Sequence, residues 1–191
     1  MEHPDSERPI NAVERSELGG LLRANAASWR SLLGRGDLTS QRPPTAPGGP
    51  PAWSALESGV YVRDTYAWAA DRLKRMLGRK TPTFADRDAA PVAHPDRYSE
   101  GDTDAAKVSY DLARAAGKVA DMVDRVRGDQ WTRVGVEPDG GERTVESLVR
   151  DLLHQVGDRA AEVERGYEAL TADNDNDNDN GDGAAANGAG A

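Results

Sequence analysis

Three histidines are present, and only His154 lies in a segment with helical periodicity, because His3 is near the N-terminus and His94 falls in a proline-containing stretch. His154 and Asp158 are four residues apart, so they share one helix face, and an imidazole and a carboxylate can bind one metal ion together. Counted at about 100° per residue from Val145, the two side chains fall at about 180° and about 220° from the apolar stripe of their helix. This pair is therefore either part of a metal site or an exposed histidine beside an exposed carboxylate.

Two other polar residues, Asn25 and Arg63, interrupt apolar stripes, where a polar group needs a partner. Both are candidate cofactor-binding residues. The alternatives are an amide cross-link between helices for Asn25, and a salt bridge or an outward-reaching side chain for Arg63. Tyr61 and Trp68 are seven residues apart, so they share a helix face and are expected to line any cavity there.

Composition excludes several classes of function. The chain has 191 residues, no cysteine and a net charge of -9. Catalysis by a cysteine thiolate of the protein is therefore excluded, and nucleic-acid binding is not expected. The longest apolar stretch covers residues 66–70, far short of a membrane span, and the acidic N-terminus does not resemble a secretory signal. We therefore expect a cytoplasmic protein without a membrane segment. The glycine loops that hold phosphate, the Gly-x-Ser-x-Gly elbow and the His-Glu-x-x-His motif are absent.

Apolar residues recur every three or four positions in four segments, 16–33, 55–77, 103–126 and 145–170, and no segment has a clear strand pattern. Ser54 with Glu57 predicts a capping box, Thr144 an N-cap, and residues 139–141 a turn. These features predict an all-α antiparallel four-helix bundle over residues 16–170, with long connections before and after the second helix. Residues 1–15 are predicted to be flexible. Residues 171–191, rich in Asp, Asn, Gly and Ala, are predicted to be a disordered tail.

Residues 23–30, 53–57 and 62–64, followed by Trp131, the turn at residues 139–140, residues 144–145 and His154, resemble in their order an actinobacterial branch of the DinB-like superfamily. The resemblance covers roughly residues 16–165. It implies a four-helix bundle related to mycothiol-dependent maleylpyruvate isomerase-like proteins, with one divalent transition metal, zinc or nickel-like, and mycothiol as co-substrate. That metal is commonly held by one histidine in the second helix and a histidine pair in the fourth. The matching positions here are Tyr61, His154 and Asp158.

The sequence leads to three hypotheses about function. The first is a divergent, divalent-metal-assisted transferase or isomerase that uses a low-molecular-weight thiol and acts on a small molecule. The second is a metal-free four-helix bundle that binds a small molecule or a protein partner, with Asn25, Arg63 and Tyr61 as polar contacts. The third is a homodimer held by leftover apolar surface.

Overall fold

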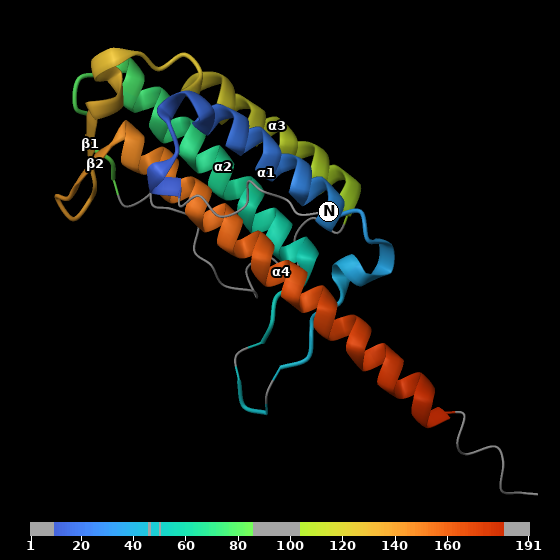
Figure 1. The fold of residues 1–191 in the computed structure, drawn as a ribbon. Helices are drawn as coiled ribbons and strands as arrows, with labels where there is room; N and C mark the ends of the chain where they lie inside the picture. The colour runs from blue at the N-terminus through green and yellow to red at the C-terminus, as the bar shows by residue number, and fades with distance from the viewer. Residues whose placement is uncertain (1–9, 46, 50, 86–103, 182–191) are drawn as a thin grey trace, which may run out of the picture.

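The computed structural model describes residues 10–45, 47–49, 51–85 and 104–181, and four helices dominate it (Figure 1). They are α1 (Leu18–Leu32), α2 (Ala55–Gly78), α3 (Ala105–Val123) and α4 (Val145–Gly181). Short 3-10 turns cover Ile10–Ala12, Arg15–Glu17, Gly36–Ser40 and Gly128–Thr132. The predicted all-α four-helix bundle is confirmed. None of the described helices is long and apolar enough to cross a membrane.

The order of the helices around the bundle differs from their order along the chain. The extensive contacts pair α1 with α3 and α4, and α2 with α3 and α4. Figure 1 shows that α1 and α4 run in one direction and that α2 and α3 run in the other. The predicted antiparallel packing therefore applies to α1 with α3 and to α2 with α4, whereas α2 and α3 are parallel neighbours. The 24 residues of α2 span about 36 Å, and the long connection after α2 lets α3 start at the same end as α2.

The core consists of the apolar stripes that the sequence predicts. The largest completely buried side chains come from all four helices and include Leu22, Trp29, Tyr66, Leu73, Met76, Leu112, Val119, Leu148 and Leu152. Removing such a side chain from water stabilises the fold by about 1.5 to 3 kcal/mol each.

The predicted capping box opens α2. The Ser54 hydroxyl accepts a hydrogen bond from the Glu57 backbone N–H at 3.1 Å, and the Glu57 carboxylate accepts one from the Ser54 N–H at 2.8 Å. Arg42 also donates to the Glu57 carboxylate. Burial alone would raise the pKa of Glu57, but the hydrogen bonds from Arg42 and Ser54 outweigh it, so this pKa lies below its ordinary value. At the start of α4, the Ser147 N–H donates to the Thr144 hydroxyl at 3.0 Å, as predicted for an N-cap.

A small β-hairpin precedes α4 and was not predicted from the sequence. Strands β1 (Val134–Val136) and β2 (Glu142–Thr144) pair in antiparallel fashion. The predicted turn lies between them, with Gly140 at a φ of +84°. Three-residue strands are too short to show the alternation that identifies a strand. Phe84 fixes the hairpin to the end of α2, because its N–H donates to the Val136 carbonyl at 2.9 Å.

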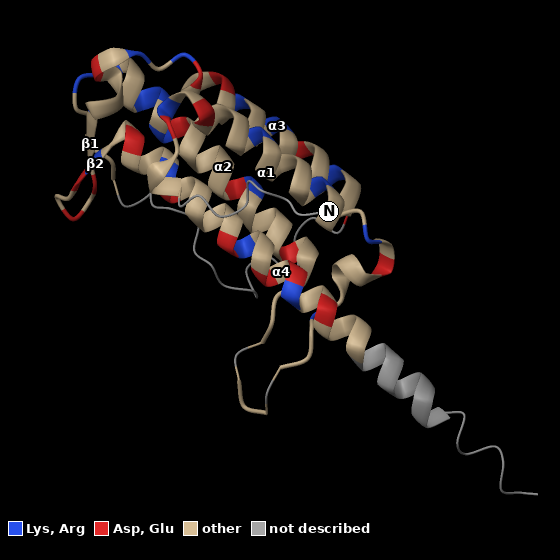
Figure 2. Cartoon of the chain, in the orientation of Figure 1, with Lys and Arg blue, Asp and Glu red and all other residues tan. Residues whose placement is uncertain are grey.

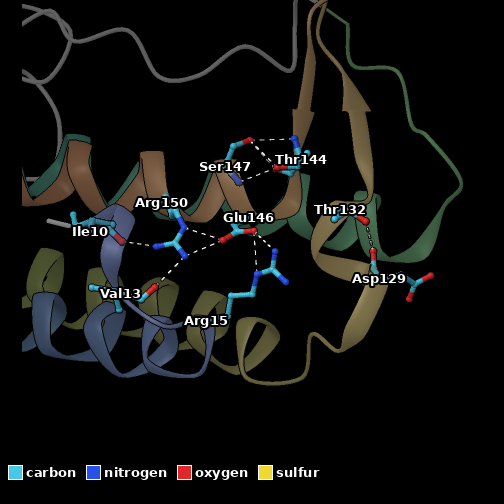
Figure 3. A network of polar contacts seen from close by, with 9 residues as sticks. All are labelled: Ile10, Val13, Arg15, Asp129, Thr132, Thr144, Glu146, Ser147 and Arg150. Atoms are coloured by element: carbon cyan, nitrogen blue, oxygen red, sulfur yellow. Dashed lines mark hydrogen bonds and ion pairs between the residues drawn. The ribbon is translucent and has the colours of Figure 1, made fainter. Parts of the chain in front are cut away.

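The chain before α1 is attached to the start of α4 by the N-terminal latch, which consists of Arg15, Glu146 and Arg150 (Figure 3). Arg15 and Arg150 both donate to the Glu146 carboxylate, and Arg150 also donates to the carbonyls of Ile10 and Val13. The hydrogen bond from Arg15 lowers the pKa of Glu146, and that from Arg150 adds to the effect against the opposing effect of burial. Of the segment predicted to be flexible, residues 1–15, the part from residue 10 onward thus contacts α4. This contact has no local sequence pattern, and residues 1–9 lie outside the described residues.

The last helix continues beyond the predicted boundary. We expected the tail to begin at residue 171, after the last apolar position, but the backbone of α4 remains helical to Gly181. Once a helix has formed, each added residue contributes only its own helix-propagation free energy, without a new nucleation step. A helix can therefore continue beyond the residues that pack against the bundle. The rest of the predicted tail, residues 182–191, lies outside the described residues.

Candidate ligand site between α2 and α4

One side of α2 presents a row of aromatic residues toward α4. Trp53 precedes the helix and packs edge-on against Tyr61, with ring centroids 5.7 Å apart and planes at 72°. Tyr61 is 3% exposed. Trp68 lies two turns farther along α2, is half-buried and lines the cavity described below, whereas Tyr61 is buried beside Trp53 and is not part of that cavity's lining.

The side chains of α4 that meet this row are Gln155 and Arg159, which are four residues apart on one face. The Gln155 side-chain amide donates a hydrogen bond to the Tyr61 hydroxyl. The Arg159 guanidinium carbon lies 4.5 Å from the ring centroid of Trp53 and 5.4 Å from that of Tyr61, within the range of cation–π attraction. Glu162 pairs with Arg159 at 2.6 Å and balances its charge.

The structure places the three expected metal ligands in different surroundings. Of the expected ligands Tyr61, His154 and Asp158, only Tyr61 takes part in the contact described above, and its hydroxyl is bonded to Gln155. His154 is half-buried and Asp158 is exposed. Each precedes the contacting residue by one position, which is about 100° around the helix. No group of three His, Cys, Asp or Glu side chains among the described residues is placed to hold a metal ion.

A cavity of about 430 Å³ extends from Gln155 toward the hairpin. Its walls combine an aromatic ring, two cations, two carboxylates and an amide, contributed by Trp68, Arg72, Arg143, Glu137, Asp151 and Gln155. A volume of this size lies within the range of about 300 to 1,000 Å³ that is typical of small-molecule sites.

Arg72 forms the inner wall of the cavity and is 2% exposed. One of its terminal nitrogens, Nη1, donates to both carboxylate oxygens of Glu137 at 2.5 Å. Its guanidinium carbon lies 4.0 Å from the ring centroid of Phe84 and 4.7 Å from that of Trp68. A buried cation needs such partners, and this pair connects the hairpin to α2.

Arg143 lies at the mouth of the cavity and is held much less firmly. Its Nε lies 3.4 Å from a Glu137 oxygen, and its Nη1 lies 3.5 Å from an Asp151 oxygen. These contacts are longer than charge-assisted hydrogen bonds, and the Arg143 side chain makes no hydrogen bond with any described residue. Its side chain is 35% exposed and that of Asp151 is 57% exposed. Figure 2 shows that charges of both signs alternate along this part of α4.

The candidate cofactor-binding residues Asn25 and Arg63 lie elsewhere. The Asn25 carbonyl oxygen accepts a hydrogen bond from the Tyr66 hydroxyl at 2.9 Å, which connects α1 to α2. Burial raises the pKa of Tyr66, so its hydroxyl stays protonated and remains a donor. Arg63 donates to Asp64 at 2.9 Å and lines a groove of about 330 Å³ between α2 and α3. The hydrogen bond of Asn25 with Tyr66 and the ion pair of Arg63 with Asp64 match the alternatives of cross-link and salt bridge.

Sequence reasoning missed several residues of the site. Gln155 and Arg159 fall about 80° and about 40° from the apolar stripe of α4. Helical periodicity therefore predicts that both side chains lie at the edge of the buried face. Arg72 lies in a segment with several other cations at the end of α2, and nothing in its local sequence distinguishes it from them. Glu137 and Arg143 belong to the hairpin, which has no sequence pattern of its own.

Comparison with known proteins bears on the fold. No family model and no curated protein sequence matches the chain. Among solved structures, the chain is similar to YfiT from Bacillus subtilis, with a TM-score of 0.66 and 15% sequence identity over 90% of this chain and 94% of that chain. YfiT is described as a probable metal-dependent hydrolase with an unusual four-helix bundle topology. At this level of identity, the likeness establishes a shared fold.

Proposed function

We propose that this chain is a DinB-like four-helix bundle that binds a small organic molecule between α2 and α4 without a metal ion. The observation that carries the proposal is the position of Arg159, whose guanidinium lies against Trp53 and Tyr61 and is paired with Glu162. This is the part of α4 that meets Tyr61, the residue that the family resemblance assigns to the metal. A cation is already present there.

Electrostatics favours this arrangement over metal binding. Two unit positive charges 4 Å apart repel each other by about 4 kcal/mol at an effective dielectric constant of about 20, and a dication doubles this cost, of which the Glu162 carboxylate offsets a part. A guanidinium donates hydrogen bonds and accepts none, and it stays protonated at any physiological pH, so Arg159 cannot become a ligand. The Gln155 amide already satisfies the Tyr61 hydroxyl. The cavity beside these residues then serves as the binding site.

The test is a metal titration by calorimetry with zinc, nickel and manganese, together with elemental analysis of the purified protein. We expect the wild-type chain to bind no metal more tightly than His154→Ala does. In a double variant, Gln155→His with Arg159→His, we expect zinc affinity to appear, because two imidazoles then face Tyr61. Arg165→His is the matched control, since Arg165 is an exposed arginine on the same helix. Near-stoichiometric metal in the wild type that is lost in His154→Ala would refute the proposal.

A second candidate is the metal-assisted transferase or isomerase that uses a thiol such as mycothiol, with Tyr61, His154 and Asp158 around the ion. Its support is the fold shared with YfiT and the half-buried position of His154. It requires α4 to turn so that His154 and Asp158 replace Gln155 and Arg159 beside Tyr61. Metal-dependent consumption of a low-molecular-weight thiol by the wild type, lost in His154→Ala, would favour this candidate. The homodimer and the cytoplasmic location stay predictions, the former to be checked by sedimentation.

A further inference from the structure

We propose that the cavity between α2 and α4 binds a zwitterionic α-amino acid with an apolar side chain, a ligand class that deepens the proposed function and rests on it. Arg143 receives the carboxylate, Asp151 receives the ammonium group, and Trp68 packs against the apolar side chain. The argument uses the free donors of Arg143, the charge balance of the cavity walls and the aromatic wall.

Arg143 is the group that most clearly needs a ligand. A guanidinium has five N–H donors in a fixed planar fork, and those of Arg143 make no hydrogen bond with the described residues. Its nearest carboxylate, that of Glu137, already accepts two short bonds from Arg72 and lies 3.4 Å away. A ligand carboxylate at the mouth of the cavity would meet two parallel N–H groups of Arg143, the geometry that gives strong and directional bonds.

Asp151 sets the second requirement. It lies one helical turn before Gln155, on the same face of α4, and its ion-pair contact is with Arg143 at 3.5 Å. When Arg143 turns to a ligand carboxylate, Asp151 loses this contact and faces the ligand without a partner. An ammonium group on the same ligand restores the pairing, whereas a simple carboxylic acid leaves two carboxylates competing for Arg143.

The overall charge of the walls leads to the same class of ligand. Among the described residues that line the cavity, the cations Arg72 and Arg143 balance the carboxylates Glu137 and Asp151. A neutral ligand that carries both charges keeps this balance, and a monoanion or a monocation does not. Trp68 supplies a flat apolar wall beside these charges, which fits the side chain of an apolar or aromatic amino acid. The volume of about 430 Å³ leaves room for one such molecule.

The test is calorimetry with three probes of one shape: L-phenylalanine, 3-phenylpropionate, which lacks the ammonium group, and phenethylamine, which lacks the carboxylate. We expect L-phenylalanine to bind at least about tenfold more tightly than either of the others. Arg143→Gln should remove the advantage over phenethylamine, and Asp151→Asn the advantage over 3-phenylpropionate. Glu142→Gln, an exposed change in the same hairpin, should leave all three affinities unchanged. Circular dichroism confirms that each variant is folded.

Two results would overturn the inference. The first is equal affinity for L-phenylalanine and 3-phenylpropionate, which would identify a simple anion site. The second is no detectable binding of any probe to the folded wild-type protein. The titrations are run with a chelator and repeated with zinc. Failure of the proposed function would appear as metal uptake by the wild type, whereas failure of this inference would appear as the absence of amino-acid binding, so the two failures are distinguishable.

Discussion

The contact between the hairpin and α2 offers a sharp test of how this bundle is held together. Arg72 is buried among Trp68, Phe84 and the carboxylate of Glu137, and the Arg72 side chain is 3% exposed. Glu137→Gln keeps the shape of that side chain and one hydrogen-bond acceptor, but it removes the negative charge. The buried guanidinium then loses the carboxylate to which its Nη1 donates.

The expected cost follows from this burial. Removing one partner of a buried ion pair costs about 3 to 5 kcal/mol, and the retained amide oxygen places this variant at about 3 kcal/mol. The contact from Arg143 to Glu137 is long and partly exposed, so it adds less than about 1 kcal/mol. In a chain of this size, a loss of about 3 kcal/mol lowers the melting temperature by about 6 to 12 °C. The double variant Arg72→Met with Glu137→Gln removes the buried charge as well, and it should recover to within about 1 kcal/mol of the wild type.

The assay is urea unfolding followed by far-ultraviolet circular dichroism, with the melting temperature as a second measure. An unchanged m-value would show that the variants alter stability and not the extent of unfolding. Glu142→Gln is the control, because Glu142 is exposed on the same hairpin. If Glu137→Gln were within about 1 kcal/mol of the wild type, or if the double variant were less stable than the single one, the account of Arg72 as a buried cation that depends on Glu137 would be wrong.

Other residues give further predictions. Gly135→Ala should destabilise the fold by about 1 to 3 kcal/mol in urea unfolding, because a Cβ atom there would lie 2.5 Å from the Phe84 ring; an unchanged midpoint would contradict this packing. Ser54→Ala should cost about 1 kcal/mol through the lost cap, and Ser54→Thr should restore most of it. The pKa of Glu57 is lowered in the folded state, so its stabilising contribution is complete above the ordinary value of 4.5 and is lost as the pH falls through the folded pKa. Unfolding between about pH 5 and pH 3 should therefore show a shallower loss of stability in Glu57→Gln, and an identical pH dependence would argue against the Arg42 contact.

Local patterns predicted most of the fold because local physics determines those parts. The stripe through Leu112 and Val119 is buried as expected, and the Ser54 cap forms because its partner lies three residues away. Periodicity identifies the face that a helix buries, but it does not identify the helix that covers that face. The parallel order of α2 and α3 is therefore invisible in the sequence. The hairpin was missed because each strand has three residues, and it is held by Phe84, which is distant in the chain.

The candidate site was predicted in part. The shared face of Tyr61 and Trp68 follows from their spacing, and Trp68 lines the cavity, whereas Tyr61 is buried beside Trp53. Arg72 has the same local surroundings as the exposed cations near it, and its burial depends on Glu137, which is 65 residues away. On α4, the resemblance pointed to His154 although the periodicity placed it away from the buried face. A difference of one residue in register moves a side chain about 100° around a helix, which is enough to exchange Gln155 for His154 beside Tyr61.

The N-terminal latch has a consequence for how the chain folds as it is synthesised. Arg150 donates to the Ile10 carbonyl, which is 140 residues earlier in the sequence. The segment before α1 therefore leaves the ribosome long before its partner on α4 exists. Closing so long a loop is slow, and a domain that relies on such contacts cannot complete its structure until nearly the whole chain is available. During this interval the apolar stripe of α1 has no cover from α4, so a nascent chain halted before residue 145 should be a target for chaperones.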